Sequence, residues 1–288
     1  MTTYNLDLQE LDSLKHKTVL IIGAATGIGR AAVDVAHERG ANVAFGDWNE
    51  AEGLNIVEKL KTRVFFRRCD VSKWDDVLHL FHETWLKFGP IHAIISNAGI
   101  NTHDSLLEDE YDPDSGILLE PNLKSIEVNL IGQIYVVKCA THYIKHWPEI
   151  QTEIVLTASA GSFFPAPPIH LYCAAKSGVL GLMRALRYDM KGRNATINVI
   201  APWLTLTPML LPDWLEKWGK LPKNTCEGVA HALFLPVVRP DINGKAFFVA
   251  GDKIIEFEDT LHESQPHWMG RALSDDVNEG QRFLTGEK

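Results

Sequence analysis

The chain has 288 residues, of which 45% are hydrophobic and 23% are charged, as in ordinary globular proteins. Its formal net charge of −9 argues against nucleic acid or an anionic membrane surface as the main partner. No uninterrupted apolar stretch is long enough to span a bilayer, and the first residues do not resemble a signal peptide. The four cysteines are scattered, which favours reduced thiols in a cytoplasmic protein and no metal site.

Apolar runs and helical patterns alternate along most of the chain. The apolar runs, which predict buried strands, cover residues 18–23, 42–47, 64–68, 93–97, 153–157 and 196–201. Helical patterns follow the first two runs to residues 40 and 60, cover residues 73–88 and 124–146, and include a further helix that carries Tyr172. This alternation predicts an α/β fold: a doubly wound (Rossmann) parallel sheet flanked by helices on both faces, in a single domain.

Two segments interrupt the alternation. Residues 104–121 are rich in Asp and Glu and contain no Lys or Arg, which predicts a solvated loop. The tail carries Trp268 and Met269 as possible anchors. We therefore expect a dinucleotide-binding and catalytic domain over residues 1–255, and a C-terminal extension over residues 256–288 that packs on this domain or on a neighbouring subunit.

A glycine-rich turn joins the first apolar run to the first helical pattern. It reads Gly23-x-x-x-Gly27-Ile28-Gly29. Glycines at such a turn let the backbone bend tightly and approach a pyrophosphate, which then faces the N-terminus of the helix. A glycine triplet alone is a weak signal, and a plain strand-to-helix turn is the alternative. Its position between strand and helix strengthens the interpretation as a dinucleotide site.

Asp47 ends the second apolar run. A carboxylate at this place can accept hydrogen bonds from the ribose hydroxyls of a dinucleotide, and it repels a 2′-phosphate, so it favours NAD over NADP. No arginine stands in the glycine turn, where position 26 is Thr, or directly after Asp47, where position 48 is Trp. The alternative is an aspartate that only caps the next helix.

Tyr172 and Lys176 stand four residues apart at the start of a predicted helix. Side chains at this spacing are neighbours on one helical face. A lysine beside a tyrosine lowers the pKa of the phenol, because a positive charge stabilises the phenolate. Taken alone, such a pair is more often a solvated lysine beside a half-buried tyrosine, so other motifs have to decide.

Several motifs, in order, resemble those of the short-chain dehydrogenase/reductase family over roughly residues 15–252. They are the glycine turn, Asp70-Val71, Asn97-Ala98-Gly99, Asn129, Ser159 at the family's spacing before Tyr172, and Thr207. The resemblance implies that the dinucleotide contacts Gly23, Thr26, Gly27, Ile28, Gly29, Asp47, Trp48, Asp70, Val71, Asn97, Ala98, Gly99, Tyr172, Lys176 and Thr207.

The resemblance also implies a catalytic set of Asn129, Ser159, Tyr172 and Lys176. In this interpretation Tyr172 gives or takes the proton of the substrate oxygen, and Lys176 lowers the Tyr172 pKa and binds the nicotinamide ribose. Ser159 forms a hydrogen bond to the reacting oxygen. Asn129 links Lys176 to solvent through a water molecule. The cofactor itself supplies the hydride chemistry.

The chain departs from the family where Trp203 follows Pro202, because the family usually has glycine there. The resemblance places substrate-covering residues after this point and between Ser159 and Tyr172. We expect substrate contacts from Phe163, Phe164, Trp203, Met209 and Trp214. Such a lining suits a bulky apolar or aromatic substrate. An alternative for Trp214 is a place on a core-facing helix stripe.

We therefore expect an NAD(P)(H)-dependent oxidoreductase that interconverts a secondary alcohol and a ketone, with NAD favoured. The 104–121 segment and the tail resemble fungal members related to 15-hydroxyprostaglandin dehydrogenase, some of which act in secondary metabolism. One alternative is a biosynthetic imine reductase or cyclase, suggested by Trp203. Another is a non-enzymatic dinucleotide sensor, which the intact catalytic set argues against.

Self-association is a further expectation. The family commonly pairs subunits through the helices expected here at residues 124–146 and 172–190. The second of these carries Val179, Leu180 and Met183 among other apolar residues, more than one sheet face needs. A homodimer or homotetramer is the prediction.

Overall fold

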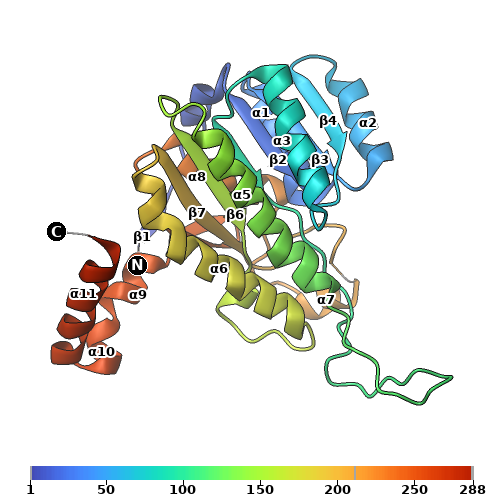
Figure 1. The fold of residues 1–288 in the computed structure, drawn as a ribbon, viewed down its shortest axis with the longest axis vertical. Helices are drawn as coiled ribbons and strands as arrows, with labels where there is room; N and C mark the ends of the chain where they lie inside the picture. The colour runs from blue at the N-terminus through green and yellow to red at the C-terminus, as the bar shows by residue number, and fades with distance from the viewer. Residues whose placement is uncertain (1, 211, 287–288) are drawn as a thin grey trace.

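A nine-stranded sheet forms the centre of the protein, which a computed structural model describes over residues 2–210 and 212–286 (Figure 1). The strand order across the sheet is β1-β9-β8-β7-β6-β5-β2-β3-β4. The strands are β1 (Thr2–Tyr4), β2 (Thr18–Ile22), β3 (Asn42–Asp47), β4 (Val64–Arg68), β5 (Ala93–Ser96), β6 (Thr152–Thr157), β7 (Ala195–Pro202), β8 (Ala246–Ala250) and β9 (Lys253–Glu256).

In this sheet order, all neighbouring strands from β8 across to β4 run parallel to each other. Strand β9 pairs antiparallel with β8, and β1 pairs antiparallel with β9. The chain winds from β2 through β3 to β4 in one direction, then returns and winds from β5 to β8 in the other. This reversal lies between β2 and β5. In doubly wound sheets the ligand binds beyond the carboxyl ends of the strands at such a reversal.

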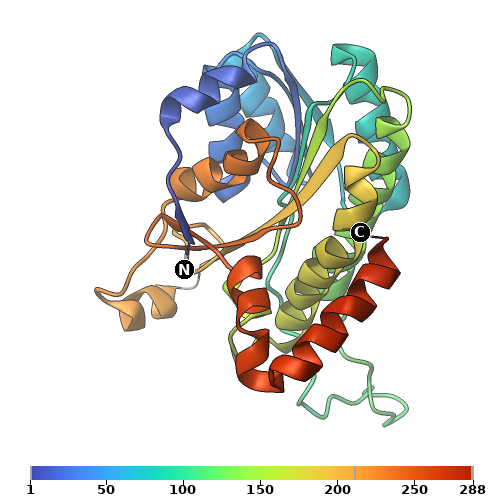
Figure 2. The same ribbon diagram turned by 90° about the vertical axis from the view of Figure 1, so that its left-hand side faces the viewer.

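Helices cover both faces of the sheet (Figures 1 and 2). One face is covered by the 3₁₀-helix η1 (Leu8–Leu14), α1 (Gly27–Glu38), α2 (Glu50–Leu60) and α8 (Cys226–Val238). The other is covered by α3 (Trp74–Phe88), α5 (Gly132–Ile144) and α6 (His170–Lys191). The remaining helical segments are α4 (Lys124–Ile126), the π-helical turn η2 (Glu127–Ile131), the 3₁₀-helix η3 (Ala160–Ser162), α7 (Pro212–Trp218), α9 (Glu258–Glu263), α10 (Gln265–Met269) and α11 (Arg271–Thr285).

Each face of the sheet has its own apolar core. Phe45, Phe234 and Phe247 are fully buried on the side of α1 and α8, whereas Leu80 and Phe81 are fully buried on the side of α3 and α5. Strands that are covered on both faces consist of continuous apolar runs, which is why these strands could be predicted from the sequence. The predicted doubly wound α/β fold in one domain is confirmed.

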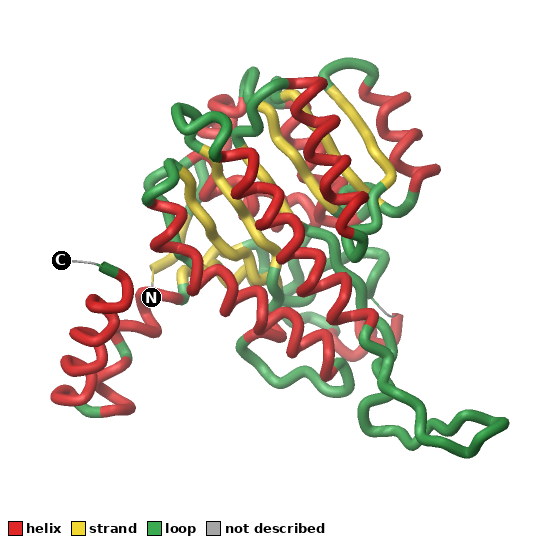
Figure 3. Tube along the Cα trace, in the orientation of Figure 1, coloured by secondary structure: helices red, strands yellow, loops and turns green. Residues whose placement is uncertain are grey.

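Two segments project from this body (Figures 1 and 3). The first is the acidic loop after β5, in which Tyr111 and Leu118 form an isolated antiparallel bridge. The second is the C-terminal helical segment, α9 to α11, which lies apart from the sheet and exposes Trp268, Phe283 and Leu284. Among the described residues, no helix combines the length and the apolar character that crossing a membrane requires.

The apolar residues of α6 are not surplus surface. Val179, Leu180 and Met183 are buried in the core of their own chain, and Leu182 and Leu186 pack against the same cluster. The apolar residues of α6 are therefore no argument for self-association, because these side chains pack within the core of their own chain.

Candidate active site

The glycine turn between β2 and α1 lies at the reversal point of the sheet. Gly23 has a φ of +79°, and a Cβ atom on it would lie 2.3 Å from Cα of Ala98 in the loop after β5. A Cβ on Gly29 would lie 2.0 Å from the carbonyl oxygen of Gly23. Larger residues at these positions would separate the two loops. The turn leads into α1, where Thr26 precedes the helix without a side-chain hydrogen bond to its first N–H groups.

A cavity of about 990 Å³ opens beyond the carboxyl ends of the strands at this point. Of the residues that we expected to contact cofactor or substrate, those that line it are Gly23, Thr26, Gly27, Ile28, Asp47, Trp48, Asp70, Val71, Asn97, Ala98, Gly99, Ser159, Phe164, Tyr172, Lys176, Trp203, Thr207, Met209 and Trp214. The size and the glycine-lined wall fit an extended dinucleotide whose phosphates face the start of α1.

Three predicted site residues lie behind the cavity wall. Gly29 packs within the turn. Asn129 is fully buried in the π-helical turn. Phe163 packs its ring on Phe257, with ring centroids 4.4 Å apart, so the structure places it beside the C-terminal segment and not in the cavity lining.

Asp47 is buried at the end of β3, and its carboxylate serves the glycine turn. Oδ2 accepts the N–H of Ala25 at 2.8 Å, and Oδ1 accepts the N–H of Asn49 at 3.0 Å. The cap of α2 is the side chain of Asn49, which accepts the N–H of Glu52. The alternative interpretation of Asp47 as a helix cap is therefore wrong.

An arginine lies closer to Asp47 than the sequence suggested. Arg68 pairs in register with Asp47 across β3 and β4, and both residues line the cavity. Arg68 is exposed. The sequence shows no arginine in the glycine turn or directly after Asp47, but the neighbouring strand brings Arg68 to the cavity from a distant part of the chain.

Ser159, Tyr172 and Lys176 meet at one wall of the cavity. The Ser159 hydroxyl shares a hydrogen bond with Tyr172 and also accepts the N–H of Gly161 at 3.1 Å. Lys176 Nζ lies 5.8 Å from the centre of the Tyr172 ring and donates to the carbonyl oxygen of Thr157 at 2.8 Å. Tyr172 and Lys176, four residues apart on one face of α6, thus both lie near the end of β6.

Burial dominates the ionisation of this pair. It raises the pKa of the Tyr172 phenol, and the hydrogen bond with Ser159 acts in the opposite direction. Burial also lowers the pKa of Lys176 to about 8. In this geometry Ser159 is the group whose hydrogen bond lowers the pKa of Tyr172.

Asn129 organises the backbone next to Lys176. Its amide nitrogen donates to the carbonyl oxygen of Ile100 at 2.8 Å, and its amide oxygen accepts the N–H of Ile100 at the same distance. A Cβ on Gly99 would lie 3.2 Å from Asn129 Oδ1 and 3.3 Å from Lys176 Nζ. The two side chains therefore converge over Gly99, in a π-helical turn of the kind that often occurs at functional sites.

Aromatic rings form the opposite part of the cavity around Trp203. The Trp203 ring lies 5.2 Å from Trp218, 5.9 Å from Phe164 and 6.1 Å from Phe248, measured between centroids. Phe248, from β8, packs against the rings of Trp203 and Phe164 but does not itself line the cavity. The clustering explains how a bulky indole is accommodated directly after β7.

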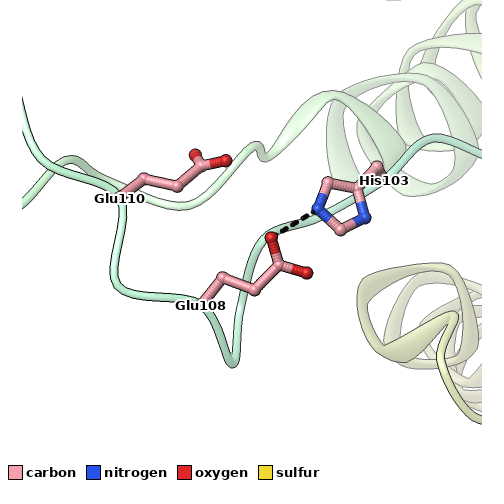
Figure 4. A group of neighbouring side chains, drawn as sticks. All are labelled: His103, Glu108 and Glu110. Atoms are coloured by element: carbon pink, nitrogen blue, oxygen red, sulfur yellow. Dashed lines mark hydrogen bonds and ion pairs between the residues drawn. The ribbon is translucent and has the colours of Figure 1, made fainter.

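His103, Glu108 and Glu110 form a separate cluster in the projecting loop (Figure 4). His103 Nε2 and Glu108 Oε2 lie 2.9 Å apart, and the ligand atoms of all three residues lie within 4.8 Å of one another. All three side chains are exposed. Exposed acidic groups commonly gather in this way without an ion, so the cluster is assigned no metal.

Comparison with known proteins identifies related sequences. The family model for short chain dehydrogenase matches residues 17–217. A short-chain dehydrogenase/reductase, ATR7, from Stachybotrys chlorohalonatus is 31% identical, with 99% of this chain and 94% of the relative covered. The 5'-hydroxyaverantin dehydrogenase of Dothistroma septosporum is 28% identical, with 92% and 93% covered.

Solved structures share the fold at lower identity. A 3-ketoacyl-(acyl-carrier-protein) reductase from Brucella melitensis, solved in complex with NADH, superposes with a TM-score of 0.72. It is 21% identical, and the match covers 83% of this chain and 98% of that one.

Proposed function

The chain belongs to the short-chain dehydrogenase family, and from this we propose that it interconverts a secondary alcohol and a ketone on a bulky apolar or aromatic substrate with a nicotinamide dinucleotide. One observation carries the proposal. Ser159, Tyr172 and Lys176 lie together on the wall of a cavity that the glycine turn also lines. A proton-exchanging group and a dinucleotide site therefore face the same space.

The roles that we propose follow from this placement. Tyr172 transfers the proton of the substrate oxygen, and Ser159, which is already hydrogen-bonded to the phenol, orients that oxygen. Lys176 stabilises the phenolate and holds the nicotinamide ribose, while the carbonyl oxygen of Thr157 fixes the position of Lys176 Nζ. The bound dinucleotide supplies or accepts the hydride. Positioned proton transfer of this kind is worth roughly a hundredfold or more in rate.

NAD is the cofactor that we propose as preferred. The supporting observation is the buried Asp47 carboxylate in the cavity wall, because it repels a 2′-phosphate and its oxygens have lone pairs left for the ribose hydroxyls. Arg68 acts against this repulsion, since an exposed guanidinium in the same wall attracts phosphate. We therefore propose a modest preference for NAD over NADP.

The residues on the substrate side of the cavity favour a large apolar or aromatic substrate. Trp203 and its ring neighbours present apolar surface with edges and faces that suit another ring. One relative is named as a dehydrogenase of 5'-hydroxyaverantin, which is the reaction class proposed here. Its fungal source and those of the other fungal relatives support a place in secondary metabolism.

An imine reductase or cyclase is the second candidate. The observation that favours it is the cluster of indole rings at Trp203 and Trp218, because an aromatic face stabilises a nearby cation such as an iminium group. Acceptance of cyclic imines in preference to ketones of the same shape would select this candidate over the first.

Self-association and the division into a domain over residues 1–255 and an extension over residues 256–288 stay predictions. We propose a homodimer or homotetramer in the cytoplasm. Light scattering at micromolar concentration tests the first part directly, and a monomer mass would contradict it.

A panel of secondary alcohols, ketones and cyclic imines tests the proposed function, each with NAD(H) and NADP(H), followed at the nicotinamide absorbance. The expected result is turnover of bulky aromatic ketones or alcohols, faster with NAD(H). Tight dinucleotide binding without turnover of any member would favour a sensor instead.

A further inference from the structure

The first turn of α6 carries Tyr172 but has no cap from its own segment. Ile169 occupies the capping position and offers no side-chain acceptor to the open N–H groups of the helix. The first N–H groups of a helix have no partner within the helix, and uncapped ends fray. Tyr172 is the third residue of α6, so fraying there would move the phenol.

Asp104 supplies the missing acceptor from the loop after β5. Its Oδ2 accepts the N–H of Leu171 at 2.9 Å, and its Oδ1 accepts the N–H of Leu106 at 3.2 Å and lies 3.4 Å from Nδ1 of His170. The residue is only 4% exposed. Burial opposes ionisation of this carboxyl, but the N–H groups of Leu171 and Leu106 outweigh it and hold the pKa of Asp104 below its usual value.

The neck of the projecting loop fixes Asp104 in place. The carbonyl oxygen of Asp104 accepts the N–H of Asn122 at 3.2 Å, and the side chain of Asn122 donates to the carbonyl oxygen of His103 at 2.9 Å. The two ends of the loop are thereby joined next to the start of α6. A negative charge at this end also interacts favourably with the helix dipole.

Lys176 does not depend on this cap in the same way. It lies one turn further along α6, is buried, and is held by the carbonyl oxygen of Thr157. Tyr172 has one polar side-chain partner, Ser159. Loss of the cap should therefore disturb the phenol and leave the dinucleotide side of the site in place.

We propose that Asp104 is a positioning residue that caps α6 and holds the Tyr172 phenol against Ser159 and the substrate oxygen. This proposal rests on the proposed function only in its kinetic part, because the cap itself can be measured without turnover. Asp104 does not line the cavity, and it acts through the backbone of Leu171.

The test compares Asp104→Ala, Asp104→Asn and Asp104→Glu with wild type in the full chain. Asparagine keeps one oxygen, which can still accept the N–H of Leu171 although the contact to the N–H of Leu106 is lost. Alanine keeps no acceptor, and glutamate keeps the charge but moves the acceptors. We expect kcat to fall about tenfold in Asp104→Ala and several-fold in Asp104→Glu, with Asp104→Asn within about threefold of wild type. The Kd for NADH, measured by fluorescence, should change less than twofold. Asp109→Ala is the matched control, because Asp109 is exposed in the same loop.

Hydrogen exchange at the Leu171 amide separates the cap from the chemistry. We expect this amide to exchange about tenfold faster in Asp104→Ala than in wild type or Asp104→Asn, whether or not a substrate has been found.

A kcat that is unchanged in both Asp104→Ala and Asp104→Glu would overturn the positioning role, as would an equal loss in Asp109→Ala. An Asp104→Asn variant as defective as Asp104→Ala, beside an Asp104→Glu variant with wild-type kcat, would also overturn it, because charge and not capping would then matter. If Asp104→Ala is insoluble, the asparagine and glutamate variants still decide. A wild-type chain that turns over nothing would contradict the proposed function alone, since the exchange result stands apart.

Discussion

Oδ2 of Asp47 accepts the N–H of Ala25 at 2.8 Å, which ties the end of β3 to the glycine turn after β2. The same carboxylate that would meet the ribose of a dinucleotide therefore also fixes the turn that would meet its phosphates. The two ends of the cofactor site are coupled through one side chain, which is 9% exposed.

Asp47→Ala should weaken NAD binding and lower stability at once. The N–H of Ala25 would lose its partner in a buried place, which costs roughly 1–3 kcal/mol. The preference for NAD over NADP should narrow by about tenfold, because loss of the negative charge removes repulsion of a 2′-phosphate. Calorimetry with both cofactors and urea unfolding measure the two effects. Glu58→Ala, on the exposed side of α2, is the control. A wild-type chain that binds NADP at least as tightly as NAD would contradict the role given to Asp47.

Arg68→Gln should act on NADP alone. Arg68 lines the cavity and pairs in register with Asp47, so its loss should remove attraction for a 2′-phosphate but no contact that NAD needs. We expect NADP affinity to fall about tenfold and NAD affinity to stay within twofold, both measured by calorimetry at one ionic strength. Equal losses for the two cofactors would instead assign Arg68 to the adenine or the shared phosphates.

Trp203→Gly should change substrate choice more than folding. The variant restores the residue that the family usually has after this proline and opens the space between Phe164 and Trp218. KM for aromatic substrates that fit the wild-type cavity should rise about tenfold, and substrates too bulky for the wild-type cavity should gain relative to them. Trp268→Gly, an exposed indole in α10, is the control. Failure to recover any soluble Trp203→Gly protein would make Trp203 a core residue and remove the main support for the pocket.

Glu153→Gln should make the free energy of unfolding depend less on pH. Burial between β5 and β7 raises the pKa of Glu153 to about 7, partly offset by its hydrogen bond from Thr196. Because the folded pKa exceeds the unfolded value of 4.5, the folded chain binds this proton more tightly. The stabilisation is complete below about pH 4.5 and is lost as pH rises through 7, a change of roughly 3 kcal/mol.

Urea unfolding at pH 5 and pH 8 measures this difference. Wild type should lose more free energy of unfolding over that interval than Glu153→Gln does. Glu149→Gln, which alters an exposed carboxylate close by, should behave as wild type. Identical pH dependence in all three chains would mean that Glu153 is already ionised at pH 5.

Much of the fold was predictable because strands that are buried on both faces of the sheet appear in the sequence as continuous apolar runs. The predicted runs at residues 42–47 and 64–68 coincide with β3 and β4. In contrast, β8 was not predicted although its residues Ala246–Ala250 are apolar, and the two remaining strands, β1 and β9, were not predicted either. They are short, and they form only because β9 turns back on β8 and β1 pairs with β9 from the other end of the chain. The helices α9 to α11 were missed because few of their side chains enter a core.

The residues of the candidate site likewise fall into those that the sequence predicted and those that it did not. Residues that follow a strand directly, such as Gly23, Asp47 and Asn97, were placed correctly at the cavity, because carboxyl ends of parallel strands meet at one edge. Arg68 beside Asp47 depends on strand pairing, and Asp104 beside Leu171 depends on how a long loop folds back. Neither relationship leaves a signal in local sequence.

Tyr172→Phe tests the central claim, that this phenol transfers the proton of the substrate oxygen. The change removes one hydroxyl and keeps the ring, so cavity shape and dinucleotide binding should persist. We expect kcat to fall at least a hundredfold on the best substrate of the panel, with the Kd for NADH within about threefold of wild type. Retention of more than about a tenth of the wild-type rate, with cofactor binding intact, would contradict the account.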